Sequence, residues 1–352
     1  MKYVVLISLI FLLGISSVFA QETTPPVPTP FAPPPPSYRQ TGFTYHAQWW
    51  NNCGPATVTT ALSYFGYTED QARAANWLKP NTEDKNVSPW QLEQFVDTQV
   101  SELPVFSLYR YGGTLERLKM LISNNFVVMI EAGYDPDRAN QGWMGHYLLV
   151  VGYDDAQQII ITNDSYDGEG LAYSYAHIEE HWKHFNYMYF VIYESAREPE
   201  LFSLLGEDAD VRENYINAFE VAREQATANL TDGYAWFNMG SMLTKLEMYE
   251  NAAAAFDQAF SHNMPWRTTW YQFMPFEAYY HMERYQDVLN MAQTLIDSSS
   301  SYVEEAFYYA GLARAALGET DRAINNFNAV LTFNPNFFPA REEIARLNGT
   351  AP

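Results

Sequence analysis

The sequence contains one cysteine, Cys53, within the run Gln-Trp-Trp-Asn-Asn-Cys-Gly-Pro-Ala that spans residues 48–56. The residues that follow, 57–65, suit a helix, so the cysteine is predicted to lie at a helix start. Backbone N–H groups and the positive end of the helix dipole point at a sulfur in that place and lower its pKa. Because the thiolate is the form that attacks a carbonyl carbon, the pattern predicts a nucleophilic thiol.

A nucleophilic thiolate works with an imidazole, and His146 is the candidate base. Seven histidines are present, and His146 is the one that opens a buried-looking strand, the run 146–152 after Gly145. The alternative is a half-buried strand histidine without a chemical role. An isolated cysteine at a helix start in the same predicted domain favours the base.

The imidazole also needs a group that fixes its orientation. The next strand-like run ends in Asn163 and Asp164, and a turn at 154–156 joins it to the strand of His146. Adjacent antiparallel strands bring residues 146 and 164 to the same end of a sheet. Because neighbours on a strand point to opposite faces, only one of the two side chains faces the imidazole. We favour Asp164, with Asn163 as the alternative; an aspartate that only starts the turn 164–168 is a third interpretation.

The oxyanion of an acyl-transfer reaction needs hydrogen-bond donors, and Gln48 lies just upstream of the cysteine. Its side-chain N–H, together with the backbone N–H of Cys53, is the predicted pair of donors. Trp49, Trp50 and Trp143 flank this predicted site, where they either line a substrate cleft or pack in a core.

The elements that position these residues mix helices and strands between about residues 41 and 196. Helices are predicted after Cys53, over 70–78, from Ser88 with Pro89 and Gln91 as a helix-start signature, and over 114–123. Strand-like runs then follow at 126–131, 146–152, 158–162 and 187–193. Helices first and antiparallel strands later predict an α+β domain over 41–196.

From residue 197 to 350 the sequence reads as helical throughout and contains an internal repeat. The repeat resembles the tetratricopeptide repeat, whose small residues let paired helices approach each other. A degenerate middle copy is predicted over 271–298, and Ala218 and Ala222 suggest an earlier, weaker one. Such an all-α domain predicts a protein partner or a bound substrate. The two clearest copies contain Trp236, Met239, Gly240, Leu243, Ala252, Phe256, Ala259 and Pro265, and Phe307, Ala310, Gly311, Arg314, Ala323, Phe327, Val330 and Pro335.

The composition and the N-terminal residues limit the classes of function that this protein can have. The 42 acidic residues against 20 Lys and Arg give a net charge of −22, which repels nucleic acids and anionic membranes. Residues 1–20 resemble a secretory signal, and 21–40 form a proline-rich linker that should act as an extended spacer. No later segment approaches a transmembrane length. We therefore expect a secreted or extracytoplasmic protein, held at most loosely at the cell surface.

Two metal patterns are weighed and set aside. His177 and His181 lie one helical turn apart in the pattern H-x-x-E-H, but a third zinc ligand has no clear candidate. The runs 135–140 and 164–169 are rich in Asp, but neither has the full spacing of a calcium loop. The sequence predicts no metal and no cofactor.

Three motifs together carry a family resemblance. Gln-x4-Cys-Gly-Pro-Ala, Gly-His-Tyr-x3-Val-Gly-Tyr-Asp-Asp and Asn-Asp resemble the papain-like cysteine peptidases related to bacteriocin-processing, double-glycine peptidases. The likeness covers about residues 41–194. It implies a papain-like fold with Cys53 as nucleophile, His146 as base, Asp164 as orienting residue and Gln48 as oxyanion donor. Processing members of that family are fused to an export transporter, whereas this chain carries helical repeats, so leader-peptide cleavage is not implied.

These observations predict an exported cysteine peptidase that forms an acyl-enzyme and uses its repeats to bind a protein partner or substrate. One alternative is a catalytically weak papain-like shell that acts as an extracellular binding scaffold. Another keeps the nucleophile but changes the acceptor, as in an amidase or a transamidase of cell-wall peptides.

Overall fold

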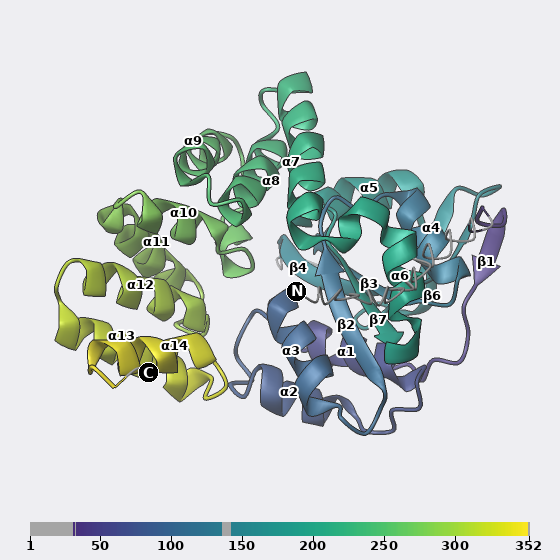
Figure 1. The fold of residues 1–352 in the computed structure, drawn as a ribbon, viewed down its shortest axis with the longest axis horizontal. Coiled ribbons are helices and arrows are strands. Elements are labelled where there is room, and N and C mark those ends of the chain that lie inside the picture. The colour runs from purple at the N-terminus through teal and green to yellow at the C-terminus, as the bar shows by residue number, and fades with distance from the viewer. Residues whose placement is uncertain (1–30, 32, 136–141, 351–352) are drawn as a thin grey trace, which may run out of the picture. The chain divides into compact units, whose positions relative to one another are not determined.

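The structure, a computed structural model, describes residues 31, 33–135 and 142–350 (Figure 1). The predicted signal segment 1–20 lies outside the described residues, and so does the predicted linker up to residue 30. Within the described part of the chain, no helix has both the length and the apolar character that spanning a bilayer requires.

An antiparallel sheet of seven strands lies at the centre of the α+β region, residues 33–194, in the part of the chain that the structure describes. Its strand order is β2-β7-β3-β4-β5-β6, and β1 pairs with β4 off this path. Successive strands β3, β4, β5 and β6 are hydrogen-bonded neighbours, so this half of the sheet is a meander. The strands are β1 (Ser37–Arg39), β2 (Val105–Arg110), β3 (Val127–Tyr134), β4 (Met144–Asp154), β5 (Ile159–Asp164), β6 (Gly168–Ser174) and β7 (Tyr189–Glu194).

Helices cover both faces of this sheet. On one face, Leu62 and Phe95 share a hydrophobic core with Met129 and Tyr147 of the central strands. The alternate residues of β3 are buried as well, and α4, α5 and α6 contact the central strands there. The helices are α1 (Cys53–Ser63), α2 (Gln71–Leu78), α3 (Pro89–Gln99), α4 (Leu115–Ser123), α5 (Tyr175–Trp182) and α6 (Glu198–Leu205), with short 3-10 turns at Lys183–Phe185, Ser195–Arg197 and Gly206–Ala209.

Capping residues set the starts of the helices that the sequence predicts. The Asp70 carboxylate accepts from the N–H of Ala72, and Thr114 caps the N-terminus of α4. Ser88 and Gln91 form the reciprocal capping box, with proline at the first helical position. The α+β prediction is confirmed, because helices precede an antiparallel sheet whose four predicted strands are all present.

The helical region, residues 198–350, continues from the sheet as a series of helix pairs (Figure 1). Gly240 of α8 and Gly311 of α12 explain the spacing shared by the two clearest repeat copies. A Cβ on Gly240 would lie 2.9 Å from the Phe256 ring, and one on Gly311 would lie 2.6 Å from the Phe327 ring. Only glycine admits that approach. The helices are α7 (Val211–Ala228), α8 (Gly233–Lys245), α9 (Tyr249–Phe260), α10 (Met274–His281), α11 (Tyr285–Ser298), α12 (Glu304–Ala316), α13 (Thr320–Phe333) and α14 (Phe338–Leu347), with a 3-10 turn at Thr268–Trp270.

Three strands are absent from the sequence prediction. β1 lies inside the predicted linker 21–40, and the Tyr153 hydroxyl donates to the carbonyl of Pro35 at 2.7 Å. Within the described residues the extended-spacer prediction is therefore wrong for 37–39, because these residues pair with β4 instead of remaining solvated. The other two strands that were not predicted are β2, which pairs with β7, and β6, which pairs with β5.

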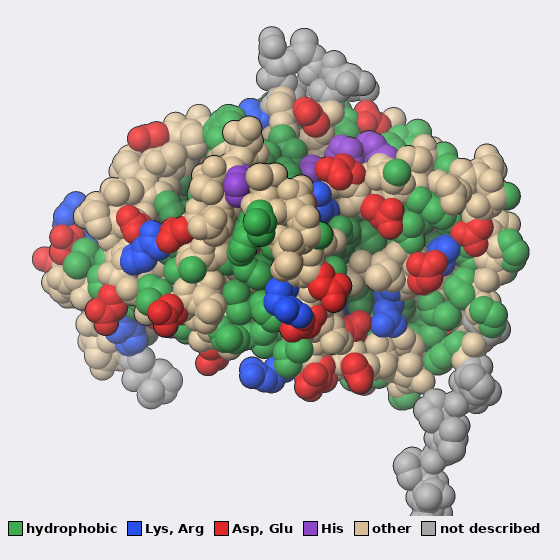
Figure 2. Space-filling model, turned by 90° about the horizontal axis from the view of Figure 1, so that it is seen from above, with side chains coloured by type: hydrophobic (Ala, Val, Ile, Leu, Met, Phe, Trp, Pro, Cys, Tyr) green, Lys and Arg blue, Asp and Glu red, His purple; other side chains and the backbone are tan. Residues whose placement is uncertain are grey.

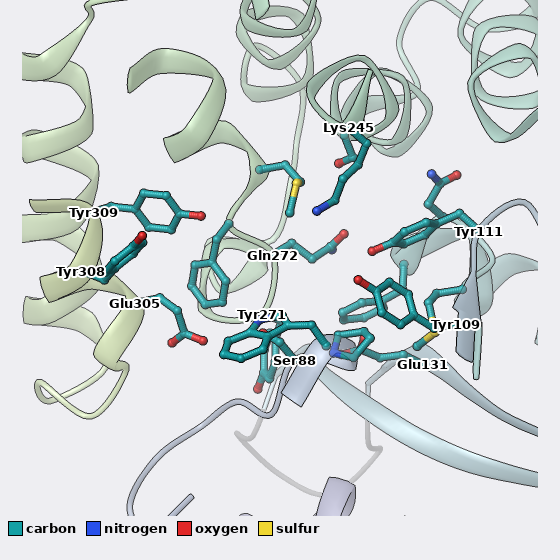
Figure 3. A pocket seen from close by; sticks show the side chains of 18 of the residues that line it. Ser88, Tyr109, Tyr111, Glu131, Lys245, Tyr271, Gln272, Glu305, Tyr308 and Tyr309 are labelled. Carbon is teal, nitrogen blue, oxygen red and sulfur yellow. The ribbon is translucent and has the colours of Figure 1, made fainter. Parts of the chain in front are cut away.

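The helical region contacts the α+β region directly. Asn334 donates to the carbonyl of Leu78 at 3.2 Å, and Asn336 donates to that of Trp77 at 2.9 Å. Between the two regions lies a pocket of about 210 Å³ (Figure 3). Its labelled side chains come from both regions and are mainly tyrosines and carboxylic acids, among them Tyr109, Tyr111, Glu131, Glu305, Tyr308 and Tyr309.

Candidate active site

Cys53 is the first residue of α1, and its side chain is half-buried. The chain enters the helix through a turn in which Asn51 has a φ of 52° and the N–H of Asn52 donates to the carbonyl of Trp49. The Asn52 amide donates to Gln71 Oε1 at 2.5 Å, which ties this turn to α2. The sequence therefore places the sulfur at a rigid helix start, where the first backbone N–H groups surround it.

His146 lies on β4, and its Nε2 is 2.8 Å from Oδ1 of Asp164, the last residue of β5. Both side chains are buried, with 4% and 0% of their surface exposed. The antiparallel register places Asp164 opposite Leu148, two residues beyond the histidine, so the hairpin brings the two groups to one end of the sheet. The Cys53 thiol interacts with the same imidazole, and each of the two groups shifts the pKa of the other.

Asp164 is held by donors other than the imidazole. Its Oδ1 accepts from the N–H groups of Tyr166 at 2.8 Å and Asp167 at 3.1 Å, and its Oδ2 accepts from the Tyr173 hydroxyl at 3.2 Å. Asn163, the alternative orienting residue, accepts from the N–H of Gly170 instead. The strand alternation thus selects Asp164 as the neighbour of the imidazole.

The pKa values of the three groups move in the directions that an ion pair requires. Burial raises the pKa of Cys53, but the hydrogen bond and charge of His146 and the N–H of Gly54 outweigh it, so that the net pKa is lowered. Burial lowers the pKa of His146, while the Asp164 carboxylate and the thiolate raise it to about 10. The pKa of Asp164 is likewise lowered, because the imidazolium and the backbone donors outweigh burial. All three shifts favour the charged forms, that is thiolate, imidazolium and carboxylate, over the neutral ones.

Gln48 is attached to the segment that follows Asp164. Its backbone N–H donates to the carbonyl of Ser165 at 2.7 Å, and its Oε1 accepts from the Ser165 hydroxyl at 2.9 Å. An amide whose oxygen makes this bond presents its N–H groups on the opposite side. Gln48 lines the same pocket as Cys53 and His146, and its role as an oxyanion donor stays a prediction.

This pocket has a volume of about 590 Å³, which is in the range of ligand and substrate sites. Two cationic side chains, Lys85 and Arg267, also line it. Trp143 packs instead against Phe185, with stacked rings 5.9 Å apart. The aromatic lining consists of Trp49, Trp50, Tyr134, Tyr166, Trp270 and Tyr271.

Sequence reasoning missed Lys85, Arg267, Trp270 and Tyr271 as site residues. The last three belong to the helical region and come near Cys53 only through the packing of that region on the sheet. One sequence signal is Gly145, directly before the histidine. A Cβ there would lie 2.9 Å from the Tyr271 ring, so a glycine in this place indicates that another group approaches the strand closely.

The histidines of the H-x-x-E-H pattern lie on α5, where the rings of His177 and His181 stack 4.1 Å apart. Figure 2 shows a group of histidine side chains in one part of this face and another histidine apart from them, while acidic groups are spread over it. Burial and the charge of His181 lower the pKa of His177. Among the described residues, no three His, Cys, Asp or Glu side chains are grouped so that they could hold a metal ion.

Comparison with known proteins gives two family matches. Residues 38–190 match the Peptidase_C39 like family, and residues 233–261 match the tetratricopeptide repeat. No curated protein matches this chain.

Solved structures similar to this chain include MamA and YrrB. MamA 41-end from Desulfovibrio magneticus RS-1 is 16% identical and covers 43% of this chain and 84% of its own, with a TM-score of 0.35. YrrB, described as a TPR protein with an unusual peptide-binding site, is 18% identical and covers 43% of this chain and 82% of its own, with a TM-score of 0.33.

Proposed function

With residues 38–190 forming a Peptidase_C39-like domain and a tetratricopeptide repeat following at 233–261, we propose that this protein is a cysteine peptidase that cleaves peptide bonds. The observation that carries the proposal is one imidazole with two partners. His146 lies 2.8 Å from the Asp164 carboxylate and interacts with the Cys53 thiol, which helps to raise the pKa of the imidazole. Both His146 and Cys53 line an open pocket.

In the proposed reaction the Cys53 thiolate attacks the carbonyl carbon of the scissile bond. The oxyanion that forms accepts hydrogen bonds from the Gln48 amide and the backbone N–H of Cys53. The His146 imidazolium gives its proton to the leaving amine, and a thioester acyl-enzyme remains. His146 then takes a proton from water, the hydroxide attacks the thioester, and the thiolate is restored. Asp164 stays ionised and keeps the imidazole oriented throughout.

The test is alkylation of the purified full-length chain by iodoacetamide, measured against pH. We expect fast, stoichiometric modification at pH 6, where an ordinary thiol with a pKa of about 8.5 reacts slowly. Cys53→Ala should abolish modification and peptide cleavage. His146→Ala should shift the rate profile to higher pH, whereas His177→Ala, on α5, should not.

An ordinary thiol profile in the unmodified chain would contradict the peptidase proposal and favour the alternative, a papain-like shell that serves as a binding scaffold. An intact profile together with transfer of the acyl group to an amine, in place of hydrolysis, would instead identify a transamidase.

The signal-like segment 1–20 supports a second proposal, that the protein acts outside the cytoplasm. Fractionation of expressing cells and N-terminal sequencing of the mature protein test it. Recovery with residue 1 intact in the cytoplasm would contradict export. For the helical region we propose a role in binding a protein partner or substrate, in line with its tetratricopeptide repeat.

A further inference from the structure

The pocket between the α+β region and the helical region, which we call the interface pocket, is separate from the cleft of Cys53 and His146 (Figure 3). Its walls come from β2 and β3 on one side and from α8, α10 and α12 on the other. Among the described residues, only Tyr271 lines both the interface pocket and the cleft. Every residue that lines the interface pocket is buried or half-buried, and the pocket has a volume of about 210 Å³. Because sites for drug-sized ligands have volumes of about 300–1,000 Å³, the interface pocket suits a smaller molecule.

Aromatic side chains on two walls of the interface pocket are fixed by one another (Figure 3). The Trp90 ring packs edge-on against Phe337, with centres 5.6 Å apart, and Phe337 contacts the Tyr308 ring at 5.2 Å. On the side of the sheet, the rings of Tyr109 and Tyr111 meet edge-on at 5.9 Å. Rings that are held in this way offer an apolar surface to a ligand without being reorganised when it binds.

One wall carries a buried carboxyl oxygen that lacks a partner. Glu305 lies in the first turn of α12, lines the pocket, and has 4% of its surface exposed. Asn86 donates to its Oε1 at 3.2 Å, whereas its Oε2 is buried and has no hydrogen-bond partner among the described residues. Burial and the charge of Glu304 raise the pKa of Glu305 well above its usual range, against the opposing effect of Asn86 and Ser88. A buried oxygen without a partner is rare and unfavourable, so Oε2 is an open position for a hydrogen-bond donor of a ligand.

A cation lines a different wall of the interface pocket. Lys245 is the last residue of α8, and Figure 3 shows its side chain extending into the pocket from that helix. Glu131 of β3 also lines the pocket and is buried, with 4% of its surface exposed. Burial and the charge of Cys53 raise the pKa of Glu131 well above its usual range, which favours the neutral form. A neutral Glu131 does not cancel the charge of Lys245, which can therefore attract a carboxylate of a ligand.

We propose that the interface pocket binds a free amino acid. The ammonium group of the ligand bonds to Oε2 of Glu305 and replaces the proton of that carboxyl group, which passes to the solvent. The carboxylate of the ligand lies at Lys245, and its side chain packs against the aromatic rings. A zwitterion is the class of ligand that can use an acid on one wall and a cation on another. The inference does not depend on the peptidase proposal, because none of Cys53, His146, Asp164 and Gln48 lines the interface pocket.

The probes are free L-amino acids and derivatives that lack one of the two charges. A thermal-shift screen of the full-length chain with each amino acid at about 10 mM selects the probe, because a ligand that binds only the folded state raises Tm. Calorimetry then gives Kd for the selected amino acid, for its methyl ester, which has no carboxylate, and for its N-acetyl derivative, which has no ammonium group. We expect each derivative to bind roughly tenfold more weakly than the free amino acid, since each loses a charge-assisted hydrogen bond. If no amino acid raises Tm, or if the N-acetyl derivative binds as tightly as the free amino acid, the proposal is wrong.

Two variants assign the charges of the ligand to the two walls. Glu305→Gln keeps the shape of the side chain, and we expect it to raise the Kd of the free amino acid roughly tenfold and to leave the Kd of the N-acetyl derivative unchanged. Lys245→Met should raise the Kd of the free amino acid by a similar factor but not the Kd of the methyl ester. Glu250→Gln, an exposed change on α9, is the matched control and should change no Kd.

The Tm of each variant without ligand shows whether it folds, and either variant alone tests the proposal if the other does not fold. Equal effects of Glu305→Gln on the free and the N-acetyl ligand would show that the ammonium group does not meet Glu305, which overturns the proposal. Equal effects of Lys245→Met on the free amino acid and its ester would do the same for the carboxylate.

A last variant separates the interface pocket from the cleft. Gln48 lines the cleft and not the interface pocket, so Gln48→Ala should leave the Kd of the free amino acid unchanged. Loss of binding in Gln48→Ala, together with full binding in Glu305→Gln, would place the amino acid in the cleft and contradict the proposal.

Discussion

The protein has two buried clusters of ionisable groups, in which the pKa values of the carboxyl groups are shifted in opposite directions. At the candidate active site, Asp164 is fully buried and its pKa is lowered. Where the helical region meets the α+β region, Asp84, Glu304 and Glu305 are just as buried, with 2 to 4% of their surface exposed. Burial and the neighbouring carboxylates raise the pKa of Asp84 well above its usual range. Burial alone therefore does not decide whether a carboxyl group keeps its charge.

The number of hydrogen-bond donors separates the two clusters. Asp164 accepts from the imidazole, two backbone N–H groups and one hydroxyl, all of which stabilise the anion. Asp84 and Glu304 instead share a hydrogen bond with each other, which requires a proton on one of them. The cation that acts on Asp84 and Glu304 is Lys79, whose own pKa is lowered by burial. The first cluster is built to hold charge, and the second holds a proton.

We expect the largest effect from the removal of the Asp164 carboxylate, which accepts the most hydrogen bonds of the carboxylates compared here. Asp164→Asn keeps the shape of the side chain but replaces an acceptor of the imidazole N–H with a neutral amide. We expect kcat to fall by roughly 10²- to 10⁴-fold, because the imidazole loses its orientation and the charge that favours its protonation. The pKa of His146 should fall from about 10, so the alkaline limit of peptide cleavage, which needs the imidazolium proton for the leaving amine, should move to lower pH. An unchanged alkaline limit would mean that Asp164 does not control the imidazole.

A second variant tests a hydrogen-bond donor to the oxyanion, a charge that exists only during the reaction. Gln48→Ala removes a side-chain donor from the proposed oxyanion site, and we expect kcat to fall by about a hundredfold. Alkylation by iodoacetamide forms no oxyanion at a carbonyl, so its rate should stay within about twofold of that of the unmodified chain. If kcat and the alkylation rate fell by the same factor, Gln48 would act on the reactivity of the thiolate and not on the oxyanion.

The proton-holding cluster makes stability depend on pH. A carboxyl group with a raised pKa binds its proton more tightly in the folded state, so the free energy of unfolding falls as pH rises from the unfolded pKa through the folded one. Asp84→Asn replaces the shared proton with a permanent amide donor and removes one of three like charges. We expect higher stability at pH 7, by roughly 1–4 kcal/mol, and a flatter dependence on pH.

Thermal unfolding of Asp84→Asn at several pH values between 4 and 8 checks this expectation. Asp321→Asn, an exposed change on α13, is the control and should leave the curve unchanged. A variant that loses stability at pH 7 would show that Asp84 is ionised in the folded protein and stabilises it through Lys79.

The elements around the active site were predictable because their signals are local. Cys53 is the first residue of its helix, and a hairpin register brings Asp164 to His146, as spacing along the two strands indicates. The pairing of Ser37–Arg39 with β4 had no such signal, since the proline-rich composition around it suggested a solvated spacer. Arg267 was equally hidden, because only the packing of the helical region brings it to the cleft.

The smallest expected effect tests whether the donors of Asp164 act one by one. Tyr173 lies on β6, a strand that the sequence did not predict, and its hydroxyl donates the longest of the hydrogen bonds to this carboxylate, at 3.2 Å. Tyr173→Phe leaves the three shorter bonds in place. A single hydrogen bond to a charged group contributes about 1.5–3 kcal/mol at most, and a long one contributes less, so kcat should fall by no more than roughly tenfold. Tyr175→Phe, whose hydroxyl donates to Asp155 away from the site, is the matched control. A loss as large as that of Asp164→Asn would mean that the donors act as one cooperative unit, in which removal of any member releases the carboxylate from the imidazole.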